Sequence, residues 1–184
     1  MPAGDRKLTI DEMGRPSAVE HRDRPKHPVR LVLDDVRSRH NVGSIFRTAD
    51  AFGAEGIVLC GFTPHPPHRE IEKTALGATS SVPWTTATTA LEAVRQLRAE
   101  GYRVWAVEQT ANAIPFDRPT RARLERVALV FGNELYGVSE PVIAACDACL
   151  VIPQSGSKHS LNVSVCAGVV LWHHTRSTDP SPNV

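Results

Sequence analysis

The chain has 184 residues, of which 41% are hydrophobic and 22% charged, and its formal net charge is +1. This composition is typical of a globular protein with one substantial core. It excludes a membrane span, because no stretch reaches ~20 consecutive apolar residues. The N-terminus has no apolar signal segment, so we expect a cytoplasmic protein without membrane contact.

Residues 1–28 carry several glycines and prolines and show no hydrophobic periodicity, which predicts a flexible basic arm. We expect a single domain over residues 29–176 and a disordered tail over 177–184. Residues 15–30 hold five basic residues: Arg15, Arg22, Arg24, Lys26 and Arg30. A second basic cluster contains Arg118, Arg121, Arg123 and Arg126. Each cluster is either a solvated segment or a surface for RNA.

Apolar runs and helical patterns alternate along the rest of the chain. The predicted strands cover residues 29–36, 56–61, 102–109, 126–132 and 148–153. The predicted helices cover residues 41–53, 89–100, 138–146 and 160–173. Strands that are apolar along their whole length and alternate with helices predict an α/β fold, with a mostly parallel sheet covered by helices on both faces.

Three loops that follow predicted strands have an unusual polar content. They are "SRHNVGSIFR" (38–47), "GNELYG" (132–137) and "PQSGSKHSLN" (153–162). In parallel sheets, ligands bind outside the carboxyl ends of the strands, where these loops lie. The glycine patterns of dinucleotide-binding and P-loop proteins are absent, which disfavours both classes. The Asp34–Asp35 pair is compatible with a Mg²⁺ site, but that interpretation leaves loop 153–162 unexplained.

The last predicted helix begins in a polar cluster although most of its residues are apolar. Ser160, Asn162 and Ser164 place two hydroxyls and a carboxamide in a segment that is otherwise typical of a core. Such groups need hydrogen-bond partners. Either Ser160 caps the helix while Asn162 and Ser164 satisfy nearby backbone groups, or a ligand completes their hydrogen bonds.

The cysteines and histidines give little sign of a metal or redox site. Cys146 and Cys149 form a C-x-x-C that closes a helix instead of opening one, and we expect structural thiols there and at Cys60 and Cys166. The two histidines of the proline-rich segment 62–70 have no neighbouring cysteine or aspartate. We therefore expect no metal.

Together the three loops resemble the three motifs of the SpoU (TrmH-like) RNA 2′-O-methyltransferases of the SPOUT superfamily. The matching residues are Asn41, Gly43 and Arg47 in the first motif, Gly132, Asn133, Glu134 and Gly137 in the second, and Ile152, Pro153, Gly156, Ser160, Leu161 and Asn162 in the third. The resemblance covers about residues 29–172. It implies a deep C-terminal trefoil knot, an exception to the usual unknotted topology, and S-adenosyl-L-methionine as cofactor.

The resemblance also implies roles for individual residues. The expected catalytic set is Arg47, Asn41, Glu134, Ser160 and Asn162, and the expected cofactor-binding set is Val107, Gly132, Glu134, Ile152, Gln154, Ser160 and Leu161. Gln154 stands where relatives often have methionine. Since a guanidinium is a poor base, Arg47 has two open roles: it accepts the hydroxyl proton, or it clamps a phosphate and stabilises the alkoxide.

The expected partners are RNA, with transfer RNA ahead of ribosomal RNA, and a second copy of the chain. The helix predicted over residues 160–173 is apolar on most of its circumference and needs cover on several sides. Family members cover it by forming a homodimer. Two alternatives stay open: a non-catalytic RNA-binding protein on the same scaffold, and a SPOUT enzyme that methylates a base.

Overall fold

The computed structural model describes residues 6–9, 11–14, 16–116 and 126–176. The strands are β1 (His27–Asp34), β2 (Ala54–Cys60), β3 (Trp84–Ala87), β4 (Arg103–Val107), β5 (Ile114–Pro115), β6 (Val127–Phe131) and β7 (Ala148–Val151). The helices are α1 (Ala18–Asp23), α2 (Arg39–Ala51), α3 (Arg69–Ala75), α4 (Ala78–Ser81), α5 (Ala90–Ala99), α6 (Glu140–Ala145) and α7 (Val163–Arg176). The predicted tail (177–184) and three arginines of the second basic cluster, Arg118, Arg121 and Arg123, lie outside the described residues.

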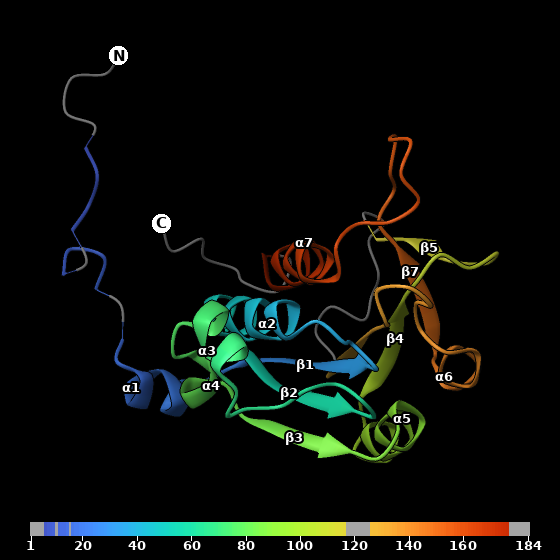
Figure 1. Cartoon of the computed structure of the whole chain (residues 1–184), viewed down its shortest axis with the longest axis horizontal. Helices are drawn as coiled ribbons and strands as arrows, with labels where there is room; N and C mark the ends of the chain where they lie inside the picture. The colour runs from blue at the N-terminus through green and yellow to red at the C-terminus, as the bar shows by residue number, and fades with distance from the viewer. Residues whose placement is uncertain (1–5, 10, 15, 117–125, 177–184) are drawn as a thin grey trace.

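The seven strands form one parallel sheet in the order β3-β2-β1-β6-β4-β7-β5. Side chains alternate between its two faces. Leu31 and Leu33 of β1 join the core under α2, α3 and α7, whereas Val32 joins the core under α5 and α6. Figure 1 shows the same division, with α2, α3 and α7 on one side of the sheet and α5 on the other. The predicted α/β class is confirmed.

Local sequence explains where the helices begin. Ser38 Oγ accepts a hydrogen bond from Asn41 N over 3.3 Å at the start of α2, and Thr89 Oγ1 accepts one from Glu92 N over 3.2 Å at the start of α5. Within α2, a side chain at Gly43 would collide with α3, because its Cβ would lie 2.3 Å from the carbonyl oxygen of Ile71. Glycine there permits close packing of the two helices.

Part of the N-terminal segment that was predicted to be a flexible arm is folded. Helix α1 lies within residues 1–28, and β1 starts at His27 rather than at 29. His21 Nε2 lies 3.1 Å from the carbonyl oxygen of Asp50, and the Arg22 guanidinium donates to the carbonyl of Ser80. These contacts attach residues 18–23 to α2 and α4.

The last helix begins at Val163, so its predicted start at Ser160 is wrong. Asn162 provides the cap, because its Oδ1 accepts from Ser164 N over 2.9 Å and from Ser164 Oγ over 2.7 Å. Among the described residues, no helix has the length and apolar character needed to cross a membrane.

Candidate active site

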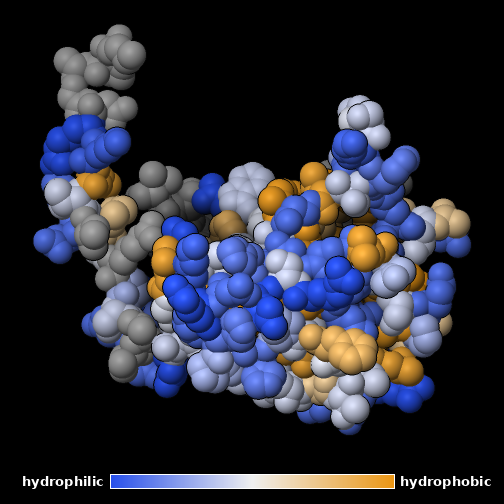
Figure 2. Space-filling view, in the orientation of Figure 1, coloured by the Kyte–Doolittle hydropathy of each residue, from blue (hydrophilic) through white to orange (hydrophobic). Residues whose placement is uncertain are grey.

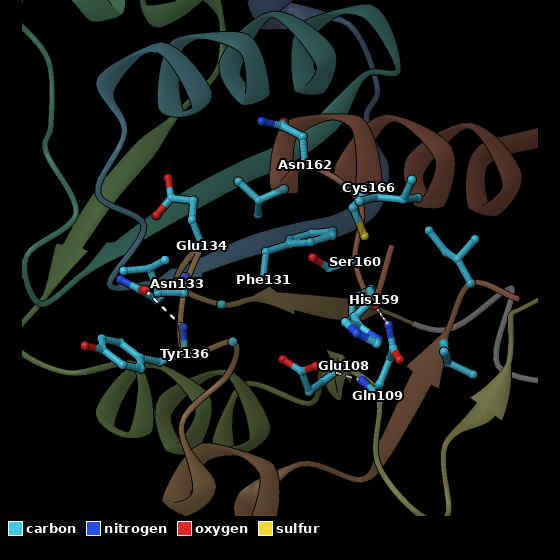
Figure 3. A pocket seen from close by; sticks show the side chains of 18 of the residues that line it. Glu108, Gln109, Phe131, Asn133, Glu134, Tyr136, His159, Ser160, Asn162 and Cys166 are labelled. Carbon is cyan, nitrogen blue, oxygen red and sulfur yellow. Dashed lines mark hydrogen bonds between the residues drawn. The ribbon is translucent and has the colours of Figure 1, made fainter. Parts of the chain in front are cut away.

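A cavity of about 520 Å³ opens at the carboxyl ends of β4, β6 and β7, where α7 begins. Its walls come from three segments that are distant in sequence: 107–109 after β4, 131–137 after β6, and 150–166 from β7 into α7. In Figure 3 the side chains of Glu108, Phe131 and Ser160 converge on this space. Its position is the one at which parallel sheets bind ligands.

The residues expected to bind a cofactor meet in this cavity. Its lining includes Val107, Gly132, Glu134, Ile152, Gln154, Ser160, Leu161 and Asn162. Asn41 and Arg47 do not line it. The lining combines apolar side chains with carboxylates and amides, a mixture suited to a ligand that has both an apolar and a charged part.

Asn41 connects the three sequence motifs through its side-chain amide. Its Nδ2 donates to Glu134 Oε1 over 2.9 Å, and its Oδ1 accepts from Asn162 Nδ2 over 3.1 Å. Asn162 in turn caps α7. A continuous hydrogen-bonded chain therefore runs from the loop after β6, through α2, to the first turn of α7.

Glu134 holds the start of α2 with both carboxylate oxygens. Oε2 accepts from Arg37 N and Oε1 from Ser38 N, each over 3.0 Å. Partial burial alone would raise the pKa of Glu134, but the two backbone donors and the Asn41 amide outweigh it, and the pKa is lowered. Glu134 therefore carries a negative charge at neutral pH.

The loop after β6 is a tight turn that two glycines make possible. A Cβ on Gly132 would lie 2.0 Å from the carbonyl carbon of Gly137, and Gly137 itself has a φ of 69°. Asn133 N and Gly137 N each donate to the other's carbonyl, over 3.0 and 2.9 Å. Val138 N donates to Glu108 Oε2 over 2.9 Å, which fixes the far end of the turn.

Arg47 lies on α2 with an exposed side chain. It makes no hydrogen bond or ion pair within the part of the chain that the structure describes. The same helix packs against α7, and a Cβ on Gly168 would lie 3.9 Å from Thr48 Cγ2. Arg47 is thus available to a molecule outside this chain.

The sequence analysis did not name Glu108 and Gln109, which line the cavity. Glu108 and Gln109 directly follow β4, and the Gln109 amide donates to the carbonyl of His159, which fastens the loop before α7 to the end of β4 (Figure 3). Their position after a buried parallel strand was the signal that would have found them.

The four cysteines are free thiols, and burial makes three of them poor nucleophiles. Burial raises the pKa of Cys166, which lines the cavity, to about 11. It also raises that of Cys146 and Cys60 to about 12. These thiols stay protonated at neutral pH.

The chain is similar to known RNA methyltransferases. The chain is 34% identical over 161 residues to the 23S rRNA (guanosine-2'-O-)-methyltransferase RlmB of Ralstonia nicotianae, covering 84% of this chain and 61% of that protein. An AdoMet-bound rRNA methyltransferase from Sinorhizobium meliloti matches with a TM-score of 0.76 at 33% identity, covering 85% of this chain and 60% of that one. The A. aeolicus TrmH/SpoU tRNA modifying enzyme matches with a TM-score of 0.76 at 25% identity, covering 86% and 79%.

The chain spans about 60% of the length of the curated relatives that it matches. The model of the SpoU rRNA Methylase family matches residues 28–172. This range contains the cavity, the glycine turn and the hydrogen-bonded chain centred on Asn41. The chain belongs to the SpoU rRNA methylase family.

Proposed function

We propose that this chain transfers a methyl group from S-adenosyl-L-methionine to a ribose 2′-hydroxyl of RNA. The observation that carries the proposal is the Asn41-centred connection of Glu134 and Asn162 beside a cavity formed by the family's motif loops. Relatives named as RNA 2′-O-methyltransferases and a neighbour bound to AdoMet support it.

The cavity suits this cofactor in size and in chemistry. Ligand cavities are typically of the order of 300–1,000 Å³. Apolar side chains of Val107, Ile152 and Leu161 fit an adenine ring, while the Glu108 carboxylate fits the positive charge of an ammonium or a sulfonium. When bound, the cofactor supplies an already activated methyl group.

The chain's own residues then have to align the hydroxyl and remove its proton. In our proposal, Arg47 contacts the RNA and serves the hydroxyl, either as proton acceptor or by clamping a phosphate and stabilising the alkoxide. Asn41 and Glu134 act as positioning residues, since their polar atoms already bind α2 and Asn162. Ser160, exposed at the cavity wall, and Asn162 position ribose and cofactor.

We also propose a homodimer that forms through α7 and α2. Val165, Val169 and Trp172 are 52%, 41% and 54% exposed, and their spacing places them on one face of α7. Arg47 lies on the neighbouring helix, so pairing through this surface would bring it toward the partner subunit. A two-fold axis would place the same patch of both chains in contact.

Light scattering at micromolar concentration tests the assembly. We expect twice the mass of the 20.1 kDa chain, and Val169→Lys should shift the population to monomers. Thr86→Lys, at an exposed position of the edge strand β3, is the matched control. A wild-type monomer with full activity would remove the dimer from the proposal.

Transfer RNA is the first substrate to test and ribosomal RNA the second, since relatives are named for both. We further propose a cytoplasmic location and the trefoil knot of SPOUT proteins. The return of the chain from β7, which lies between β4 and β5, to pack on α2 supports the knot.

Transfer of a tritiated methyl group to each RNA class tests the activity. Nuclease digestion of the product should release a 2′-O-methylated nucleotide. Cofactor binding without transfer to any RNA would support the alternative of a non-catalytic RNA-binding protein. A methylated base in the product would support the alternative of a SPOUT base methyltransferase.

A further inference from the structure

The two most exposed large hydrophobic side chains among the described residues are both aromatic. Phe62 is 87% exposed and Tyr136 is 85% exposed. Both lie on loops at the carboxyl edge of the sheet, Phe62 after β2 and Tyr136 after β6. Figure 2 shows hydrophobic side chains on the surface beside the carboxyl ends of β2 and β3. Exposure of this degree gives a ring no role in the core.

One hydrogen-bonded network holds the backbone of Tyr136 and the backbone of Phe62. Tyr136 N donates to Asn133 Oδ1 over 3.3 Å, and Asn133 Nδ2 donates to the carbonyl of Asp35 over 2.7 Å. Asp35 Oδ1 in turn accepts from Phe62 N over 2.7 Å. Asp35 adopts a φ of 53°, which is uncommon for a non-glycine residue. The loops are therefore fixed relative to each other while the rings stay in solvent.

Each ring stands at a cavity. Tyr136 belongs to the rim of the cofactor cavity, and Figure 3 shows it directed away from Phe131, Glu108 and Ser160. It can therefore contact a molecule that approaches the cavity from outside. Phe62 lines a second cavity of about 570 Å³ between the ends of β1 and β2 and the start of α5.

The second cavity has acceptors that suit nucleobases and repel phosphates. Its lining includes the carboxylates of Asp34 and Asp35. Asp34 is 6% exposed and is held by Ser139, whose N and Oγ lie 3.0 and 2.9 Å from Asp34 Oδ2. Asp35 Oδ2 has no hydrogen bond among the described residues. Carboxylates accept from base amino groups, as they do from cytosine N4.

We propose that Tyr136 and Phe62 are stacking platforms for two unpaired nucleobases of the substrate RNA. The base on Phe62 presents its N–H groups to Asp35, and the base on Tyr136 lies beside the cofactor cavity. Unpaired bases stack on exposed aromatic side chains, and proteins read them through their Watson–Crick edges. This inference rests on the proposed function, because it takes RNA as the substrate.

A binding experiment tests the platforms without methyl transfer. The probes are a labelled single-stranded RNA of about 12 nucleotides, a length within the range that single-strand binding sites cover, and the same strand annealed to its complement. Fluorescence anisotropy with S-adenosyl-L-homocysteine present gives Kd at several salt concentrations. Because both rings are exposed, substitution should leave Tm unchanged.

We expect Tyr136→Ala and Phe62→Ala each to weaken binding of the single strand about tenfold, as loss of one base stack predicts. Tyr136→Phe and Phe62→Tyr should stay within about twofold of wild type, since a ring is retained. The dependence of Kd on salt should not change, because no phosphate contact is lost. Leu76→Ala is the matched control: Leu76 is 66% exposed at the end of α3 and should bind RNA like wild type.

Alanine variants that bind the single strand like wild type would overturn the proposal. So would equal losses on the duplex, or aromatic replacements as weak as alanine. Ring-dependent RNA binding without methyl transfer by the wild type would keep the platforms and remove the proposed activity. If the wild type transfers methyl groups and neither transfer nor RNA binding changes in the two alanine variants, the proposed activity is kept and the platforms are removed.

Discussion

Asn41 Nδ2 lies 2.9 Å from Glu134 Oε1 and joins α2 to the glycine turn after β6. Asn41→Ala leaves the amide of Asn162 and one carboxylate oxygen of Glu134 with fewer partners. We expect a loss of about 1–3 kcal/mol in the free energy of unfolding, together with lower methyl transfer. Denaturant unfolding measures the first. His40→Ala, an exposed neighbour on α2, is the control and should unfold like wild type; equal stability of both variants would contradict the prediction.

Glu134 should make stability depend on pH. Because its pKa is lowered in the folded chain, its contribution is complete above the ordinary glutamate pKa of about 4.3 and is lost as pH falls through the folded value. As pH falls through this range, the Tm of the wild type should therefore decrease more than the Tm of Glu134→Gln. Thermal unfolding from neutral pH downwards measures the difference. Parallel curves of Tm against pH for the two proteins would mean that the hydrogen bonds from Arg37, Ser38 and Asn41 to the carboxylate do not stabilise the fold.

Arg47→Ala should reduce kcat by at least about tenfold, a loss of ~1.4 kcal/mol or more. Cofactor affinity should stay near wild type, because Arg47 does not line the cavity. Single-turnover transfer and calorimetric titration of the cofactor separate the two effects. Arg95→Ala, exposed on α5 at the other face of the sheet, is the control. A variant that keeps more than about a tenth of wild-type kcat would show that Arg47 does not serve the hydroxyl.

The basic N-terminal segment should contribute RNA affinity through phosphates. Because α1 and His27 belong to the folded structure, the test variants are a chain that lacks residues 1–16 and the substitution Arg24→Gln. Each lost phosphate contact should reduce the slope of log Kd against log salt by about 0.7–0.9. Kd of the RNA across a salt series gives this slope. An unchanged slope in both variants would show that the segment makes no RNA contact.

Gly132→Ala should prevent the turn after β6 from forming. The new Cβ would lie 2.0 Å from backbone carbon at Gly137, and neither segment can move without breaking hydrogen bonds. We expect a loss of about 3 kcal/mol or more, measured by thermal unfolding. Gly156→Ala is the matched control, since a Cβ there would have nothing within 4 Å. Similar Tm values for the two variants would contradict the prediction.

The sequence predicted the elements whose pattern is strong. Buried strands such as β1 and β6 and the helix after Thr89 appear where apolar runs and a helical pattern predict them. Two strands that were not predicted lack such patterns: β3 is half threonine, and β5 has two residues. Tertiary contacts, which no local pattern reports, decide whether these segments pair with the sheet.

Motif resemblance brought the cavity residues together, but it did not give their partners. The resemblance placed Asn41 and Asn162 in the catalytic set, and the structure adds that the amides of these two residues bind each other. Glu108 belongs to none of the three motifs. It lies close to Gly137 because β4 and β6 are neighbours in the sheet. Pairings of this kind depend on backbone geometry at the edge of the sheet.

The Asn41 network also has a consequence for synthesis on the ribosome. Its two hydrogen bonds join residues 93 and 121 positions apart, and Asn162 precedes the last helix. A nascent chain can form β1, β2 and α2 early, because their contacts are local. The arrangement that we propose for methyl transfer is complete only after α7 has left the exit tunnel, so a partly synthesised chain cannot hold Asn41 in its final orientation.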